Sequence, residues 1–323
     1  MEERALGASG LFVSSIALGT MGWGRDTDIH EAREQFEVYY DAGGRFIDTA
    51  DVYSEGASEE MVGEITKQRS DVLISSKAGN VQTARRRDNS RKHLLDVLDN
   101  SLRRLGRSTI DVWHLHVWDP LTPIDETLSA MDIAITSGRV RYIGMSNFSG
   151  WQSALAATRA REVLKHSPGF ISNQSEYSLL QRGIEREVIP AAQALGMGIM
   201  AWSPLGRGVL TGKYRHSTPP DSRAASTHFA SFVASFLADK PRAITEAVCT
   251  AAEGLNLSAL QVSLNWVLQR PGVASAIVGA RTTVQLRAIL SAIDEIIPNE
   301  IMEALNEVSA PDRGYPEYGW NQS

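Results

Sequence analysis

The chain has 323 residues, of which 43% are hydrophobic and 22% charged, and its formal net charge is −6 at pH 7. A chain of this length buries most of its apolar surface without disulfides or metals. The acidic balance argues against nucleic acid as a partner, because phosphate binding requires clustered Lys and Arg, and no apolar run approaches the roughly 18 residues of a membrane span.

The single cysteine, Cys249, excludes an internal disulfide framework and fits a reducing compartment. Residues 1–7 begin with an acidic pair and have no apolar run, so no signal peptide is expected. We therefore expect a cytoplasmic protein.

Short apolar, β-branched segments alternate with longer segments of helical periodicity along the chain, and their centres recur every ~28 to 30 residues with two wider gaps. The predicted strands are 15–19, 45–50, 72–77, 110–116, 141–146, 170–175, 198–203 and 274–279. Eight strands each followed by a helix are typical of a barrel of parallel strands. The predicted fold is α/β, a single (β/α)8 TIM barrel over residues 1–323, with an N-terminal β-hairpin at its bottom and extra C-terminal helices.

Capping residues mark the predicted helices. The starts are predicted at Asp28, Ser58, Ser90 and Asp125, and further helices at 188–195, 242–254 and 258–269. The segment 205–240, rich in Gly, Pro, Ser and Ala, follows the seventh strand and is expected to be a lid or a disordered segment at the barrel mouth. The basic run 85–87 is interpreted as a solvated loop.

The residues predicted at the carboxyl ends of these strands, where the chemistry of such barrels gathers, are mostly polar or ionisable. They are Asp48, with Tyr53 in the loop that follows, Lys77, His116, Ser146, Asn147, Gln174, Trp202, Ser203, Gly279 and Arg281. Each has a structural alternative: Asp48 could cap a helix, Lys77 could lie on the surface and His116 could be a hydrogen-bonded core residue. Packing alone does not explain so many polar residues aimed at one mouth.

These residue types suggest a proton relay. The pKa of a tyrosine hydroxyl is about 10, and lowering it toward 7 requires roughly 4 kcal/mol of differential stabilisation. An ammonium group such as that of Lys77 favours the phenolate, Asp48 would hold that ammonium charged, and His116 could orient a carbonyl oxygen. No side chain supplies a hydride, so a nicotinamide cofactor is implied.

Six sequence motifs, in order and in register from about residue 18 to 290, resemble the aldo-keto reductase superfamily. They are FIDTADVYS from Phe46, ISSK from Ile74, IDVWHLH from Ile110, GMSNF from Gly144, WSPLGRG from Trp202 and VGART from Val278. The segment that begins at Gly19, Thr20 and Met21 also looks like the family's first-strand loop.

The resemblance implies roles for individual residues. Asp48, Tyr53, Lys77 and His116 match the catalytic tetrad, with Tyr53 as the general acid in carbonyl reduction. The positions implied to bind the cofactor are Gly19, Thr20, Met21, Ser146, Asn147, Gln174, Trp202, Ser203, Pro204, Leu205, Gly206, Gly208, Gly279, Arg281 and Gln285. Arg281 could pair with a 2′-phosphate, which favours NADPH. Two positions depart from the family pattern, since Ala288 and Ile289 replace the acidic residue and Asn that often close the adenine site.

Trp23 and Trp118 are candidate walls for a small carbonyl substrate, or core aromatic residues, and His114 is interpreted as structural. The identity of the carbonyl compound and the oligomeric state remain open at this stage.

Other functional classes fit less well. No Gly-x-Gly-x-x-Gly follows a strand, and the segment 208–214 has the wrong spacing for a phosphate-binding P-loop. His114 and His116 could seed a metal site, but no further histidine falls at a predicted strand end, so no metal is expected. The second hypothesis is a cofactor-binding, redox-sensing module resembling potassium-channel β subunits.

Overall fold

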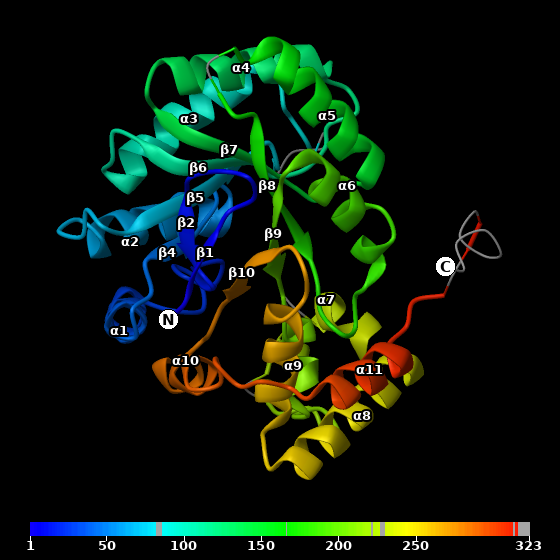
Figure 1. The fold of residues 1–323 in the computed structure, drawn as a ribbon. Helices are drawn as coiled ribbons and strands as arrows, with labels where there is room; N and C mark the ends of the chain where they lie inside the picture. The colour runs from blue at the N-terminus through cyan, green and yellow to red at the C-terminus, as the bar shows by residue number, and fades with distance from the viewer. Residues whose placement is uncertain (82–85, 166, 221, 227–229, 313, 316–323) are drawn as a thin grey trace.

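The computed structural model describes all residues except 82–85, 166, 221, 227–229, 313 and 316–323. Eight parallel strands close into a barrel in the order β10-β3-β4-β5-β6-β7-β8-β9 (Figure 1). These strands are β3 (Ile16–Gly19), β4 (Phe46–Asp48), β5 (Leu73–Ala78), β6 (Ile110–Leu115), β7 (Val140–Ser146), β8 (Phe170–Glu176), β9 (Gly198–Trp202) and β10 (Val273–Val278). The predicted (β/α)8 barrel is confirmed.

Some strands end earlier than the sequence predicts. The strand β6 stops at Leu115 and β9 at Trp202, so His116 and Ser203 lie just beyond the ladder. Ser203 has a φ of 53°, a left-handed conformation that cannot continue a strand. These residues therefore belong to the loops at the barrel mouth.

Helices cover the outside of the barrel (Figure 1). They are α1 (Ile29–Asp41), α2 (Ala57–Ile65), α3 (Arg91–Leu105), α4 (Ile124–Thr136), α5 (Gly150–Val163), α6 (Val188–Leu195), α8 (Asp239–Leu255), α9 (Ala259–Leu268), α10 (Thr283–Leu290) and α11 (Asn299–Val308). Asp28 and Ser90 cap α1 and α3 as predicted, Asp28 accepting two backbone N–H groups of the first turn and Ser90 accepting one.

Two helix starts were predicted wrongly. The helix α2 begins at Ala57 after Gly56, because the Ser58 hydroxyl bonds to Thr20 and Thr49 inside the barrel instead of capping the helix. The helix α4 begins at Ile124, one residue before Asp125, since Pro123 occupies the cap position.

An antiparallel hairpin of β1 (Glu3–Ala5) and β2 (Phe12–Ser14) closes the barrel bottom. Its Leu6 and Val13 side chains are fully buried in one cluster with Phe46, Val112 and Ile171, which lie toward the amino ends of the strands. The predicted hairpin is thus present, and the carboxyl ends of the strands remain as the open end of the barrel.

The segment 205–240 folds into short helical turns where the structure describes it. These are η3 (Gly206–Thr211), η4 (Arg223–Ala225), α7 (Ala230–Ala234) and η5 (Ser235–Leu237), and two further turns are η1 (Tyr53–Gly56) and η2 (Gly183–Glu185). Val209, Tyr214, Val233 and Phe236 bury a small apolar cluster of their own, so this segment is packed over the mouth.

The basic run 85–87 and the absence of a predicted membrane span are compared with the described residues. Arg85 lies outside the described residues, whereas Arg86 and Arg87 are exposed, as expected of a solvated loop. Among the described residues, no helix is long and apolar enough to cross a membrane.

Candidate active site

A cavity of about 550 Å³ opens at the carboxyl ends of the strands. Asp48, Tyr53 and His116 line it. So do the predicted cofactor positions Gly19, Thr20, Met21, Ser146, Asn147, Gln174, Trp202, Ser203, Pro204, Leu205, Gly208, Gly279, Arg281 and Gln285. Gly206 lies outside the lining, because its backbone turns toward Leu180, whose Cδ1 is 2.8 Å from the position of an added Cβ.

Lys77, near the end of β5, is 1% exposed and lies directly behind this lining. Its ammonium donates to the Asp48 Oδ2 atom at 2.6 Å, to the backbone oxygen of Thr49 at 2.7 Å and to the Tyr53 hydroxyl oxygen at 3.3 Å. An ammonium has three N–H donors, so all three have partners. The position of this buried charge is therefore fixed by hydrogen bonds from three directions.

Asp48 is 2% exposed, and its carboxylate accepts hydrogen bonds from residues of β5 and β8. Its Oδ1 atom accepts from the Ser75 hydroxyl at 2.9 Å and from the Gln174 amide at 2.8 Å, while Oδ2 accepts from Lys77. Both oxygens of the carboxylate are held by hydrogen-bond donors, one of them charged. Asp48 can thus act as the fixed counter-ion of Lys77.

Tyr53 begins the turn η1 after β4, and the backbone of this turn aims its hydroxyl at the cavity. Ser54 and Glu55, which follow, adopt left-handed φ values of 49° and 57°, a conformation that is unfavourable for residues other than glycine. The Ser54 hydroxyl holds the turn by donating to the Trp23 backbone oxygen at 2.7 Å. Since the phenolic oxygen accepts from Lys77, its own hydrogen is available to a group in the cavity.

The protonation of Tyr53 differs from the sequence-based expectation. Burial raises the pKa of the Tyr53 phenol above its ordinary value, and the opposing effect of Lys77 does not overcome it. Burial also acts to lower the pKa of Lys77, but Asp48 and Tyr53 raise it above its ordinary value. The expected shift of the Tyr53 pKa toward 7 was wrong, because the sequence indicates that Lys77 is a neighbour of Tyr53 but not that burial removes water from the phenol. At neutral pH the phenol keeps its proton, which suits a general acid.

His116 faces Tyr53 edge-on, with 5.9 Å between the ring centroids. Burial and the nearby Lys77 charge lower the pKa of His116 to about 3, so its imidazole is neutral at physiological pH. Among the described residues, its Nδ1 atom has no hydrogen-bond partner. A neutral imidazole on the cavity wall can donate to a carbonyl oxygen without adding charge.

His114 is fully buried and bonds to the hydroxyls of Ser75 and Ser172, at 3.3 and 2.9 Å, so it is structural. Within the part of the chain that the structure describes, no three His, Cys, Asp or Glu side chains are grouped to hold a metal ion.

Trp202 and Asn147 form one wall of the cavity beside the tetrad. The indole N–H of Trp202 donates to the Asn147 Oδ1 atom at 3.2 Å, and the Asn147 amide donates to the His116 backbone oxygen at 3.0 Å. Asn147 has a left-handed φ of 57°. This chain of contacts fixes the indole relative to His116.

The two candidate substrate walls do not line the cavity. Trp23 is 1% exposed and its indole donates to the Gln35 Oε1 atom at 3.2 Å, so it is a core residue. Trp118 packs instead against Phe148 and Trp151, with centroid separations of 5.4 and 5.5 Å. Because both residues lie in loops, sequence spacing could not predict which way they turn.

Several lining residues were missed by sequence reasoning. Asn80 follows the end of β5, and Arg207, Lys213 and Phe232 come from the segment over the mouth. Two signals in the sequence could have indicated them: Asn80 stands just after a strand, and Lys213 is a cation at the end of a glycine-rich run.

Asp51, two residues before Tyr53, was also missed. Burial and the neighbouring Glu59 raise the pKa of its carboxyl to about 7, and its Oδ1 atom has no partner among the described residues. Nothing in the residue pattern marks Asp51 apart from its closeness to Tyr53.

Comparisons with known proteins agree with this geometry. The family model described as "Aldo/keto reductase family" matches residues 15–310. The chain belongs to the aldo/keto reductase family. Members of this family are oxidoreductases that act on small-molecule carbonyl compounds and generally use nicotinamide cofactors.

Two kinds of relative stand out. The chain is 35% identical to a protein named "Uncharacterized oxidoreductase YrpG" of Bacillus subtilis (strain 168), with 99% of this chain and 100% of that one covered. It is 34% identical to "Probable voltage-gated potassium channel subunit beta" of Oryza sativa subsp. japonica, with 98% of each covered, and 33% identical to a protein of the same name from Arabidopsis thaliana, with 92% of each covered.

The residues of this aldo/keto reductase cavity fit a nicotinamide cofactor. Two buried polar atoms of the lining, His116 Nδ1 and Ser222 Oγ, have no partner among the described residues, as expected of groups that bond to a bound molecule. Lys213 and Arg281 bring positive charge to the lining, which suits the phosphates of a dinucleotide, whereas the Arg207 guanidinium is paired with Glu176.

Proposed function

We propose that this aldo/keto reductase reduces aldehydes and ketones to alcohols with NADPH. The observation that carries the proposal is the contact of the Lys77 ammonium with the Tyr53 hydroxyl oxygen, 3.3 Å apart, at the wall of the cavity. A phenol held this way keeps its own proton for a substrate and is stabilised by Lys77 as it gives that proton away. The nicotinamide cofactor supplies the hydride when bound.

Each tetrad residue has a role in this proposal. Tyr53 donates its proton to the carbonyl oxygen, which accepts a second hydrogen bond from the neutral His116. Lys77 stabilises the resulting phenolate, and Asp48 keeps Lys77 charged. The polarised oxygen thus lies between two donors that need no rearrangement during the reaction.

The proposed cofactor site extends from the tetrad along the cavity. Trp202 would pack against the nicotinamide ring, and Ser146, Asn147 and Gln174 would hold its carboxamide; the Gln174 Oε1 atom remains for this, since its NH2 group donates to Asp48. The loop from Ser203 to Gly208 would contact the pyrophosphate. The preference for NADPH over NADH rests on Arg281 at the exposed end of the lining, where a guanidinium can pair with a 2′-phosphate.

The alternative is a cofactor-binding, redox-sensing module, which the names of the rice and Arabidopsis relatives favour. Multiple-turnover assays over aldehydes, ketones and keto-sugars, with NADPH and NADH in parallel, distinguish the two. The proposal expects many NADPH consumed per protein with at least one carbonyl class, at a lower cofactor KM than for NADH. Quenching of protein fluorescence by NADPH without such consumption would favour the module.

A further inference from the structure

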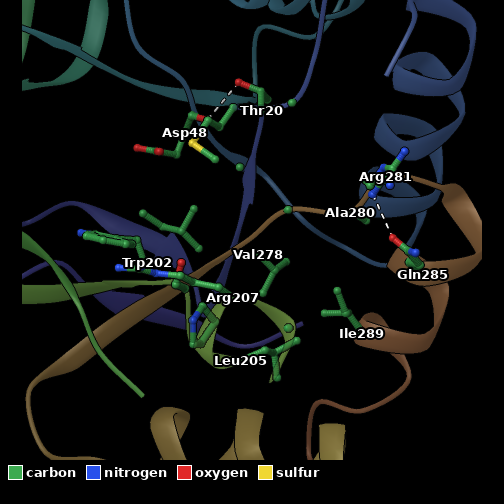
Figure 2. Close-up of a pocket in the computed structure, with 18 of the residues that line it drawn as sticks. Thr20, Asp48, Trp202, Leu205, Arg207, Val278, Ala280, Arg281, Gln285 and Ile289 are labelled. Carbon is green, nitrogen blue, oxygen red and sulfur yellow. Dashed lines mark hydrogen bonds between the residues drawn. The ribbon is translucent and has the colours of Figure 1, made fainter. Parts of the chain in front are cut away.

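The end of the cavity remote from Tyr53 has a different chemistry from the catalytic end. Its lining comes from the loop after β9, from β10 and from the helices α9 and α10, and the side chains are those of Leu205, Leu260, Val278, Ala288 and Ile289. Figure 2 shows Leu205, Val278 and Ile289 around the same hollow, with Asp48 at the opposite side of the view. This end is therefore walled by aliphatic groups.

The polar side chains near this end are turned elsewhere or lie on the rim. The Gln285 Oε1 atom accepts the Arg281 backbone N–H at 3.0 Å, as the dashed line in Figure 2 shows. Both residues are exposed. Segment 277–289 is described throughout, and none of the residues it contributes to the lining is Asp, Glu, Asn, Ser or Thr. It thus offers no carboxylate and no unengaged amide oxygen to an amino group in the hollow.

The catalytic end determines what would occupy the aliphatic end. If the reactive ring of a dinucleotide lies beside Tyr53 and Trp202, its second base must extend toward Ile289, the other end of the same cavity. Aliphatic walls hold a flat base by shape and apolar burial. Ala288 is exposed at the rim, so the polar edge of a base beside it would meet water rather than protein.

We infer that this chain does not discriminate between substituents at position 6 of the cofactor's purine, and that it accepts hypoxanthine in place of adenine. This inference rests on the proposed function and adds a specificity to it. A site that hydrogen-bonds a substrate group rejects the analogue that lacks it by large factors, whereas an apolar or solvated surface discriminates weakly. The dissociation constants of NADPH and of its hypoxanthine analogue should therefore agree within about threefold.

The test measures binding by quenching of protein fluorescence, so it does not depend on turnover. The probes are NADPH and reduced nicotinamide hypoxanthine dinucleotide phosphate, titrated into the full chain. Ala288→Glu places a carboxylate acceptor at the rim, which favours the 6-amino group and repels the 6-oxo group. This variant should raise the ratio of the two dissociation constants to about tenfold or more, equivalent to about 1.4 kcal/mol.

Two matched variants act as controls. Ala288→Gln adds nearly the same volume, but its amide can donate or accept, so the ratio should stay near that of the wild type. Val284→Glu puts the same charge on the 77% exposed position of α10, outside the lining, and should also leave the ratio unchanged.

Three results would overturn the inference. If the wild type binds NADPH but binds the hypoxanthine analogue tenfold or more weakly, the protein reads the base and only the proposed function survives. If Ala288→Glu leaves the ratio at the wild-type value, the base does not lie beside this position. If neither compound quenches the fluorescence, the proposed function fails as well.

Discussion

Replacing Lys77 with Met tests the contact on which the proposed chemistry depends. With 3.3 Å between the ammonium and the phenolic oxygen, a unit charge stabilises the phenolate by about 5 kcal/mol at an effective dielectric constant of about 20. If half of that is felt in the transition state for proton donation, the barrier rises by about 2.5 kcal/mol, and kcat falls roughly 70-fold.

The same substitution in a Tyr53→Phe background separates catalysis from structure. If Lys77 acts through the phenol, Tyr53→Phe and the double variant turn over NADPH at equal residual rates. Lys67→Met, at an exposed lysine, is the matched control and should match the wild type. A kcat within threefold of wild type in Lys77→Met, or a further loss of rate in the Tyr53→Phe background, refutes the reasoning.

Stability must be followed in the same experiment. Removing Lys77 leaves the Asp48 carboxylate buried without its counter-ion, which costs about 3–5 kcal/mol. Combining Lys77→Met with Asp48→Asn removes that carboxylate and should recover much of the loss. NADPH affinity, measured by fluorescence quenching, reports whether each variant keeps its cavity.

Three other predictions concern residues around the site and the barrel bottom. Asp51→Asn should stabilise the protein at pH 8 but not near about pH 4, because the pKa of the Asp51 carboxyl is raised to about 7 and the wild type therefore loses stability as pH rises from about 4 to 7. The gain in the free energy of unfolding, measured with urea, should be at most about 4 kcal/mol. Equal effects at both pH values would contradict this prediction. Arg207→Met should release NADPH about tenfold faster in stopped flow and expose residues 230–237 to proteases. The reason is that Arg207 pairs with both oxygens of Glu176 at 2.8 Å and bonds to the Phe232 backbone oxygen. An unchanged release rate and an unchanged cleavage pattern would contradict this role of Arg207. Gly7→Ala should lower the free energy of unfolding in urea by about 2 kcal/mol or more, because Gly7 has a φ of 63° and an added Cβ would meet the Gly196 backbone oxygen at 2.5 Å. The control Gly10→Ala, which has open space around it, should lower it far less. Equal losses would show that the hairpin does not close the barrel as described.

The sequence predicts the barrel well because its signals are local. Asp28 and Ser90 cap helices through their own first turns, and alternating β-branched runs mark strands whatever their partners. The tetrad follows from the barrel, since residues such as Asp48 and Lys77 at strand ends converge on one mouth. Ser58 shows where local signals fail. Its hydroxyl forms hydrogen bonds with Thr20 and Thr49, which lie outside α2, and so does not cap this helix.

The parts that could not be predicted depend on solvent and on loop conformation. The net pKa shift of Tyr53 combines burial with the Lys77 charge, and only the second is visible from spacing. The Trp23 backbone oxygen is held by Ser54, whose left-handed conformation no propensity predicts, and Trp118 is turned by its ring contacts with Phe148 and Trp151. Phe232 reaches the cavity because Arg207, 25 residues earlier in the same segment, bonds to its backbone oxygen and lies over its ring.

The most direct test of the account is the single turnover of an aldehyde by Tyr53→Phe with NADPH bound at saturation. The variant removes one hydroxyl from the cavity wall and leaves Lys77 bonded to Asp48 and Thr49. We predict an NADPH dissociation constant within about twofold of wild type and NADPH oxidation slowed by about 10²- to 10⁴-fold, the contribution of a positioned general acid. Oxidation at the wild-type rate with NADPH fully bound would contradict the assignment of Tyr53 as the proton donor.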